Sequence, residues 1–178
     1  GVETVIDWGC GTGVAGLRVL KAFAGLRKAC VGDASSLAVE FALQGIRRDH
    51  PGVEAQPWAG GDASGCLLVI SHVWNELGTE QRLQLLRIAG TAEAVLWVEP
   101  GTHETARDLQ TVRDHFREAF DVIAPCTHQS ACGLLAKDME RHWCHHFASP
   151  PSEVFISSDW SRFAIRAGID LRTVPYSF

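Results

Sequence analysis

The sequence predicts an α/β fold, in which helices cover both faces of a doubly wound, mostly parallel sheet. Segments typical of strands alternate with segments typical of helices along most of the 178 residues. The run from Cys66 to Ile70 is continuously apolar, as a central parallel strand should be. A glycine-rich turn after Val5 to Trp8 marks the first strand-to-helix connection.

The expected elements follow the chain in a regular order. Strands are expected at 5–8, 29–33, 53–58, 66–70, 92–98, 121–124 and 170–178. Helices are expected at 14–24, 35–48, 79–89, 102–120 and 158–167, and Ser35 is the expected cap of the second. The segment 125–151 breaks this alternation and is rich in cysteine and histidine.

The composition describes an ordinary globular chain, with 46% hydrophobic and 21% charged residues. Its length predicts one domain over residues 1–178. No apolar run approaches the roughly 20 residues of a membrane helix. The six cysteines are too scattered for a secreted disulfide framework, so a reducing, cytoplasmic setting is expected. The abrupt ends of the chain predict a domain excised from a longer protein.

The net charge of −5 gives no general attraction to nucleic acid. Any contact with RNA therefore needs a local basic patch. The candidate basic side chains lie in two expected helices and are Arg82, Arg87, Arg107, Arg113 and Arg117. A solvated helix face explains the same residues equally well.

The glycine-rich turn is the first candidate site. A strand that ends in glycines and restarts as a helix presents free backbone N–H groups to a ligand, and glycine lets that ligand approach closely. Two cofactors fit the turn. Gly11, Gly13 and Gly16 match a dinucleotide fingerprint, with Asp33 placed for a ribose hydroxyl.

The alternative pattern is Asp7, Gly9, Gly11 and Gly13, which resembles the first motif of S-adenosylmethionine-dependent methyltransferases. In those enzymes an acid at the end of the second strand binds the ribose, a role that Asp33 also fits. Asp7 favours the methyltransferase pattern over the dinucleotide fingerprint, because an acid there suits a zwitterionic amino-acid tail and repels a pyrophosphate. Ser71 and His72 follow the strand 66–70 and join the expected cofactor site.

The second candidate site is the segment 125–151. It holds three cysteines, Cys126, Cys132 and Cys144, and four histidines, His128, His142, His145 and His146. Thiolates and imidazoles at this density suit zinc or an iron–sulfur cluster. The other interpretation is that the cysteines pack as small apolar residues and the histidines are solvated. Cys30 and Cys66 occupy apolar strands and are expected to pack.

No catalytic residue is assigned from the sequence. Enzymes that methylate exocyclic amines of bases commonly carry an Asn/Asp-Pro-Pro-aromatic run after the fourth strand. Here that position reads Ser71-His72-Val73-Trp74. The Pro125-Cys126 pair lies too late in the chain for the usual position of a pyrimidine-C5 nucleophile.

Five stretches resemble one family in their order along the chain: Asp7–Gly13, Ser71–Leu77, Trp97–Thr102, Ala124–His128 and Pro175–Phe178. The family is that of the methyltransferase-like assembly factors of the mitochondrial small ribosomal subunit and their bacterial relatives. The resemblance implies a seven-stranded, Rossmann-like class I methyltransferase fold that binds S-adenosylmethionine. It also implies a [4Fe–4S] cluster on four cysteines, of which Cys126, Cys132 and Cys144 match the first three.

Through the same resemblance, the partners expected are small-subunit ribosomal RNA and ribosomal proteins. The place of action is then the cytoplasm for a bacterial protein and the mitochondrial matrix for a eukaryotic one. Three functions follow in order of preference. The first is a methyltransferase acting on the small subunit, the second a cofactor-binding assembly factor without transfer chemistry, and the third a small-molecule methyltransferase.

Overall fold

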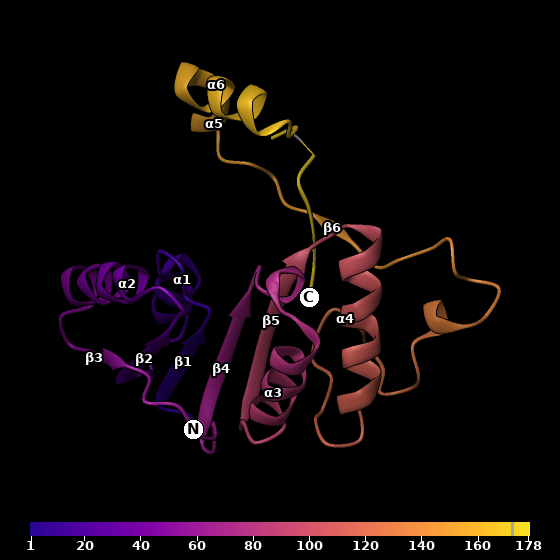
Figure 1. Ribbon diagram of the computed structural model, residues 1–178, viewed down its shortest axis with the longest axis horizontal. Coiled ribbons are helices and arrows are strands. Elements are labelled where there is room, and N and C mark those ends of the chain that lie inside the picture. Colours follow the sequence, from indigo (N-terminus) through magenta and orange to yellow (C-terminus); the bar gives the residue numbers. More distant parts are fainter. Residues whose placement is uncertain (172) are drawn as a thin grey trace. The chain divides into compact units, whose positions relative to one another are not determined.

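The computed structural model describes residues 1–171 and 173–178. These residues form two compact units, Gly1–Val98 and Glu99–Phe178. Strand β5 (Ala94–Pro100) runs from the first unit into the second (Figure 1). The single domain predicted over 1–178 stays a prediction.

The first unit is built on parallel strands that pair in the order β3-β2-β1-β4-β5. Before β5 these are β1 (Thr4–Trp8), β2 (Lys28–Gly32), β3 (Glu54–Pro57) and β4 (Cys66–Ser71). β1 and β4 are central and adjacent, with Val5 opposite Leu67 and Asp7 opposite Val69. This pairing confirms the prediction made from their apolar runs.

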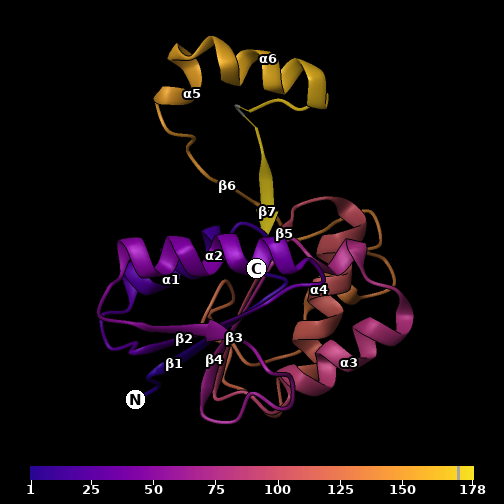
Figure 2. The same ribbon diagram turned by 60° about the vertical axis from the view of Figure 1, so that its left-hand side comes forward.

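Three α-helices belong to this unit, and all were predicted: α1 (Val14–Ala22), α2 (Ser36–Asp49) and α3 (Thr79–Ala89). α1 and α2 lie side by side, whereas α3 lies apart from them near β4 and β5 (Figures 1 and 2). Ser35 caps α2 as predicted, since its hydroxyl accepts a hydrogen bond from the Ala38 N–H. A short 3₁₀ turn, η1 (Trp74–Glu76), precedes α3.

The core of the first unit joins β1 and β2 to the inner faces of α1 and α2. Val5, Val31 and Val69 are almost fully buried, and Ile46 of α2 is completely buried. β-branched side chains favour strands that are covered on their faces, which explains why these short apolar segments form the centre of the sheet.

The second unit contains the end of β5, α4 (His103–Phe116), η2 (Gly133–Leu135), β6 (His146–Phe147), α5 (Glu153–Ile156), α6 (Ser158–Ala167) and β7 (Pro175–Ser177). β7 pairs antiparallel with Glu99 and Pro100 of β5, and β6 pairs antiparallel with β7. The pairings give the predicted seven strands, in the order β3-β2-β1-β4-β5-β7-β6.

One predicted strand is wrong. Residues 121–124 lie in the described chain and form no strand there. Ile123 is 85% exposed, and the Val122 N–H donates to the side chain of Gln129 instead of to a neighbouring strand. The sixth strand is β6, which lies inside the cysteine- and histidine-rich segment. The last strand is also shorter than the predicted 170–178, a range that includes the undescribed residue 172.

No helix of the described residues is both long enough and apolar enough to cross a membrane.

The turn between β1 and α1 depends on glycine. Gly9 has φ 69°, and a Cβ placed there would lie 2.3 Å from Cγ2 of Val73. We expect Gly9→Ala to lower the free energy of unfolding by about 2–5 kcal/mol, because left-handed strain and overpacking add. Gly25→Ala is the control, since nothing lies within 4 Å of a Cβ at that position. Chemical denaturation measures both variants, and equal effects would contradict the close approach.

Candidate functional site

A pocket of about 280 Å³ lies in the first unit, at the carboxyl ends of β1, β2 and β4. Six of the seven residues predicted to bind the cofactor line it: Asp7, Gly9, Gly11, Asp33, Ser71 and His72. The seventh, Gly13, begins α1 as its N-cap, and a Cβ there would lie 2.8 Å from that of Ala42. The structure thus collects side chains from three separate strand ends, as expected for an open parallel sheet.

Asp33 fixes the shape of the glycine loop. Its Oδ2 accepts a hydrogen bond of 2.9 Å from the Gly11 N–H, and its Oδ1 accepts one of 2.9 Å from the Ser35 N–H. One carboxylate therefore ties the loop after β1 to the start of α2. Each carboxylate oxygen can accept a second hydrogen bond, so Asp33 keeps acceptor capacity for hydroxyl groups of a ligand.

Asp7 is only 2% exposed, and its Oδ2 accepts a hydrogen bond of 2.9 Å from the Gly16 N–H. Burial raises the pKa of this carboxyl from 3.8 to about 6, the Gly16 N–H opposes that rise, and the charge of Asp33 adds to it. A Cβ at Gly16 would lie 2.6 Å from Oδ2. Gly16, which fits the dinucleotide fingerprint, is therefore needed in order to admit Asp7.

His72 takes a backbone conformation that is rare for its residue type. Its φ of 56° makes it the one non-glycine residue with positive φ in the described part of the chain. Its N–H donates to the carbonyl of Val98 at 2.9 Å, which holds the turn in place. Non-glycine residues in this region concentrate at functional sites, because the surrounding structure must offset the strain.

The sequence analysis missed other residues of this pocket, among them Cys10, Thr12 and Glu76. Burial, followed by the charges of Asp7 and Asp33, raises the pKa of the Cys10 thiol to about 12. Cys10 therefore stays protonated at neutral pH and serves as an apolar wall, not as a nucleophile. Glu76 lies in η1 after the fourth strand, where a polar Asn75-Glu76 pair was the available signal.

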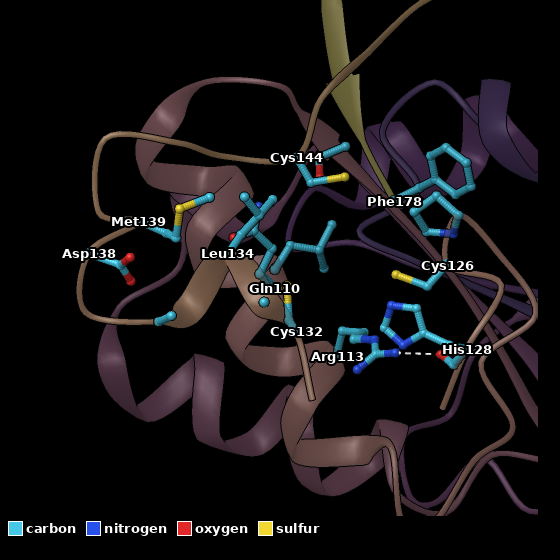
Figure 3. A pocket seen from close by; sticks show the side chains of 15 residues that line it. Gln110, Arg113, Cys126, His128, Cys132, Leu134, Asp138, Met139, Cys144 and Phe178 are labelled. Atoms are coloured by element: carbon cyan, nitrogen blue, oxygen red, sulfur yellow. Dashed lines mark hydrogen bonds between the residues drawn. The ribbon is translucent and has the colours of Figure 1, made fainter. Parts of the chain in front are cut away.

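A second pocket, of about 570 Å³, lies within the second unit. Cys126, Cys132 and Cys144 all line it, with their side chains arranged around the cavity (Figure 3). We call it the thiol pocket. Burial, and then the two neighbouring thiols, raise the pKa of Cys144. As the side chains of the described residues are placed, no three Cys, His, Asp or Glu groups stand close enough to hold one metal ion.

The histidines of the segment are divided between several roles. His128 lines the thiol pocket, and Nε2 of His146 lies 3.6 Å from the sulfur of Cys144. The ring of His145 stacks on that of Trp143, and the backbone carbonyl of His142 accepts a hydrogen bond from Arg107. Thiols and imidazoles are the ligand types that soft metals and iron–sulfur clusters take, although the described side chains do not surround one metal-ion position as they are placed.

Helix α4 holds the loop that carries these cysteines. Nη1 of Arg107 donates to three carbonyl groups, those of Leu134 at 2.9 Å, Met139 at 3.2 Å and His142 at 2.8 Å.

Arg113 makes the same kind of contact further along α4. It donates to the carbonyl groups of Ser130 at 2.6 Å and His128 at 2.8 Å. Its neighbour Asp114 accepts a hydrogen bond from the Cys132 N–H at 2.9 Å. Arg107 and Arg113 were candidates for an RNA-binding patch; the structure uses their guanidinium groups within the unit.

The family comparison is decisive on relationship. A family model described as "Mitochondrial small ribosomal subunit Rsm22" matches residues 3–164. The chain belongs to the Rsm22 family. This confirms the family that the sequence resembled. No curated protein sequence matches the chain.

Several solved structures are similar to this member of the family. The mitomycin 7-O-methyltransferase MmcR is 23% identical over 57% of this chain and 32% of its own, with a TM-score of 0.47. PKMT2 from Rickettsia typhi in complex with AdoHcy is 16% identical over 69% and 26%, with a TM-score of 0.46. The S-adenosylmethionine-dependent methyltransferase SibL is 25% identical over 62% and 36%, with a TM-score of 0.47.

This chain thus spans between about a quarter and just over a third of the length of those three proteins. Scores below 0.5 describe a loose similarity, and the order and direction of the seven strands define the fold by themselves. It is an α/β, mostly parallel, Rossmann-like fold.

The raised pKa of Asp7 predicts a pH dependence of stability. Between pH 3.8 and about 6 this carboxyl is mostly protonated in the folded protein and mostly ionised in the unfolded chain. The contribution of the protonated Asp7 carboxyl to the free energy of unfolding is therefore complete below about pH 4. It is lost as the pH rises through about 6, by roughly 3 kcal/mol in total.

Asp7→Asn should remove that loss, because an amide does not ionise. The fold should be kept, because the amide oxygen can still accept the Gly16 hydrogen bond. We expect the variant to be more stable than the wild type at about pH 7.5 and similar to it at about pH 4. Denaturation curves at several pH values measure this, with Asp62→Asn in an exposed loop as the control. A variant less stable than the wild type at neutral pH would contradict the assignment.

Proposed function

We propose that the protein binds S-adenosylmethionine in the pocket of the glycine loop and acts on the small ribosomal subunit or its RNA. The observation that carries this proposal is the meeting of Asp7, the glycine loop and Asp33 in one pocket. Asp7 would hold the ammonium group of the methionine part. The loop glycines would admit that part close to the main chain, and Asp33 would accept ribose hydroxyls.

The charge of the pocket supports this ligand over a dinucleotide. Two carboxylates, Asp7 and Asp33, face the same cavity, and their repulsion contributes to the raised pKa of Asp7. A pyrophosphate would add further negative charge beside them. S-adenosylmethionine brings a sulfonium and an ammonium group, and a cation beside Asp7 would offset the unfavourable charge.

The thiol pocket is proposed to hold a metal group on Cys126, Cys132 and Cys144, a [4Fe–4S] cluster with zinc as the alternative. The support is the donor set of three thiols around one cavity, with His128 beside them. Such a group would crosslink three distant positions of one loop and stabilise their arrangement.

The family description supports a partner on the small ribosomal subunit. We propose that ribosomal RNA and proteins of the small subunit are the binding partners. The place of action is then the mitochondrial matrix in a eukaryotic cell and the cytoplasm in a bacterial one. The half-buried Arg82 and the exposed Arg87 stay candidates for RNA contact; Arg82 also lies over the ring of Trp74 at 4.7 Å.

Calorimetric titration tests the cofactor. We expect S-adenosylmethionine to bind, and Asp33→Ala to weaken binding by about tenfold or more, because two loop contacts and the ribose acceptor are lost. Asp62→Ala is a matched control, since Asp62 also accepts a backbone N–H in a loop but lies outside the pocket. Tight binding of NADH with none of S-adenosylmethionine would overturn the proposal.

A methyl-transfer assay then separates the functions. Isolated small ribosomal subunits are incubated with the protein and methyl-labelled S-adenosylmethionine. Label in ribosomal RNA or protein identifies a methyltransferase. Co-sedimentation with subunits but no transferred label identifies a cofactor-binding assembly factor. If the protein neither binds to the subunits nor transfers label to them, the proposed partner is contradicted and a small-molecule substrate is favoured.

A further inference from the structure

The wall of the thiol pocket contributed by α4 carries a buried amide with no protein partner. Gln110 is 6% exposed and lines the cavity together with the three cysteines (Figure 3). Neither its Nε2 nor its Oε1 has a hydrogen-bond partner within the described residues. Leaving a buried polar group unpaired costs about 1–3 kcal/mol, so such groups call for a functional explanation.

A second donor stands one helical turn away on the same wall. Nε of Arg113 is buried and has no partner in the part of the chain that the structure describes. The two Nη atoms of this guanidinium are held by the carbonyl groups of Ser130 and His128. The group is therefore fixed in place, and its Nε–H is left without a partner among the described residues. Residues three apart on a helix lie on the same face, and both Gln110 and Arg113 line the cavity that the thiols line.

The chemistry of the cavity indicates what these donors would meet. Metal-bound thiolates and sulfides carry negative charge, and N–H groups are their natural hydrogen-bond donors. Such bonds tune the reduction potential of an iron–sulfur cluster and the affinity of a thiolate site for its metal. Asp138 also lines the cavity, and Asp114 is paired with Arg113.

We propose that Gln110, assisted by the Nε–H of Arg113, donates a hydrogen bond to sulfur of a metal–thiolate group held by Cys126, Cys132 and Cys144. This inference rests on the proposed metal group. Gln110 is then a positioning residue: it binds no metal itself but stabilises the thiolate group from behind. A glutamine between Leu109 and Val112 on the buried stripe of α4 is explained by this contact and not by packing, which leucine would serve as well.

Gln110→Leu tests the inference, because it replaces the amide with an apolar side chain of similar size. The metal-free protein should be as stable as the wild type or more stable, since a buried polar group is lost. The same variant should retain metal about 10- to 100-fold less well and have a lower reduction potential after anaerobic loading with iron and sulfide. These opposite directions distinguish a hydrogen bond to the metal group from a role in folding.

The measurements are denaturation of the metal-free protein, iron and sulfide analysis during chelator challenge, and a redox titration followed by visible absorption. Gln110→Glu is the second variant and should lose metal faster still, because it brings negative charge toward the sulfurs. Gln44→Leu, at an exposed position of α2, controls for the substitution itself.

If the wild type loads with metal and Gln110→Leu has the same metal retention and reduction potential, the inference is overturned and the proposed metal group is left intact. Destabilisation of the metal-free variant in proportion to its metal loss would overturn it too. Equal loading of the wild type and a Cys126→Ser, Cys132→Ser double variant, or no loading of either, would overturn the proposed metal group and this inference together.

Discussion

A single hydrogen bond, from the Gly16 N–H to the buried carboxylate of Asp7, sets the geometry on which the first unit depends. It joins the end of the central strand β1 to the first turn of α1 and so determines where the glycine loop must run between them. Asp33 then holds the loop from the other side through Gly11. Two acids thus shape the pocket before any ligand is present, and the strain in the loop is confined to residues that tolerate it.

The cost of this arrangement is a carboxylate placed where charge is unfavourable. Asp7 has little solvent, one backbone donor and another acid nearby, and its raised pKa records the sum of these effects. In the proposed complex, the ammonium group of S-adenosylmethionine would offset this charge. Binding pockets often lower the free energy of unfolding of the ligand-free protein, and ligand binding then raises it again.

Most of the fold could be predicted from the sequence, because the strands of the first unit are short apolar runs between clear turn signals. The pocket was predictable for the same reason, since Asp7, Asp33 and His72 each follow such a run. The prediction failed at 121–124, where four residues of strand-like composition find no neighbouring strand and Gln129 takes the free N–H of Val122. β6 could not be predicted, as two residues form a strand there only because β7 lies beside them. The role of Arg107 was equally hidden, because its partners are carbonyl groups that any sequence possesses.

The way α4 holds the loop that carries the three cysteines has a consequence for hydrogen exchange of that loop in solution. Arg107 and Arg113 bind it through five carbonyl oxygens, whereas Asp114 secures a single N–H, that of Cys132. Hydrogen–deuterium exchange reports only on N–H groups. Leu135, Ala136, Met139 and His142 donate their N–H groups in local turns. The remaining amide protons of the segment can exchange readily while arginine contacts to its carbonyl groups hold the backbone in place. Rapid exchange between residues 126 and 144 would therefore be compatible with cysteines that stay in position.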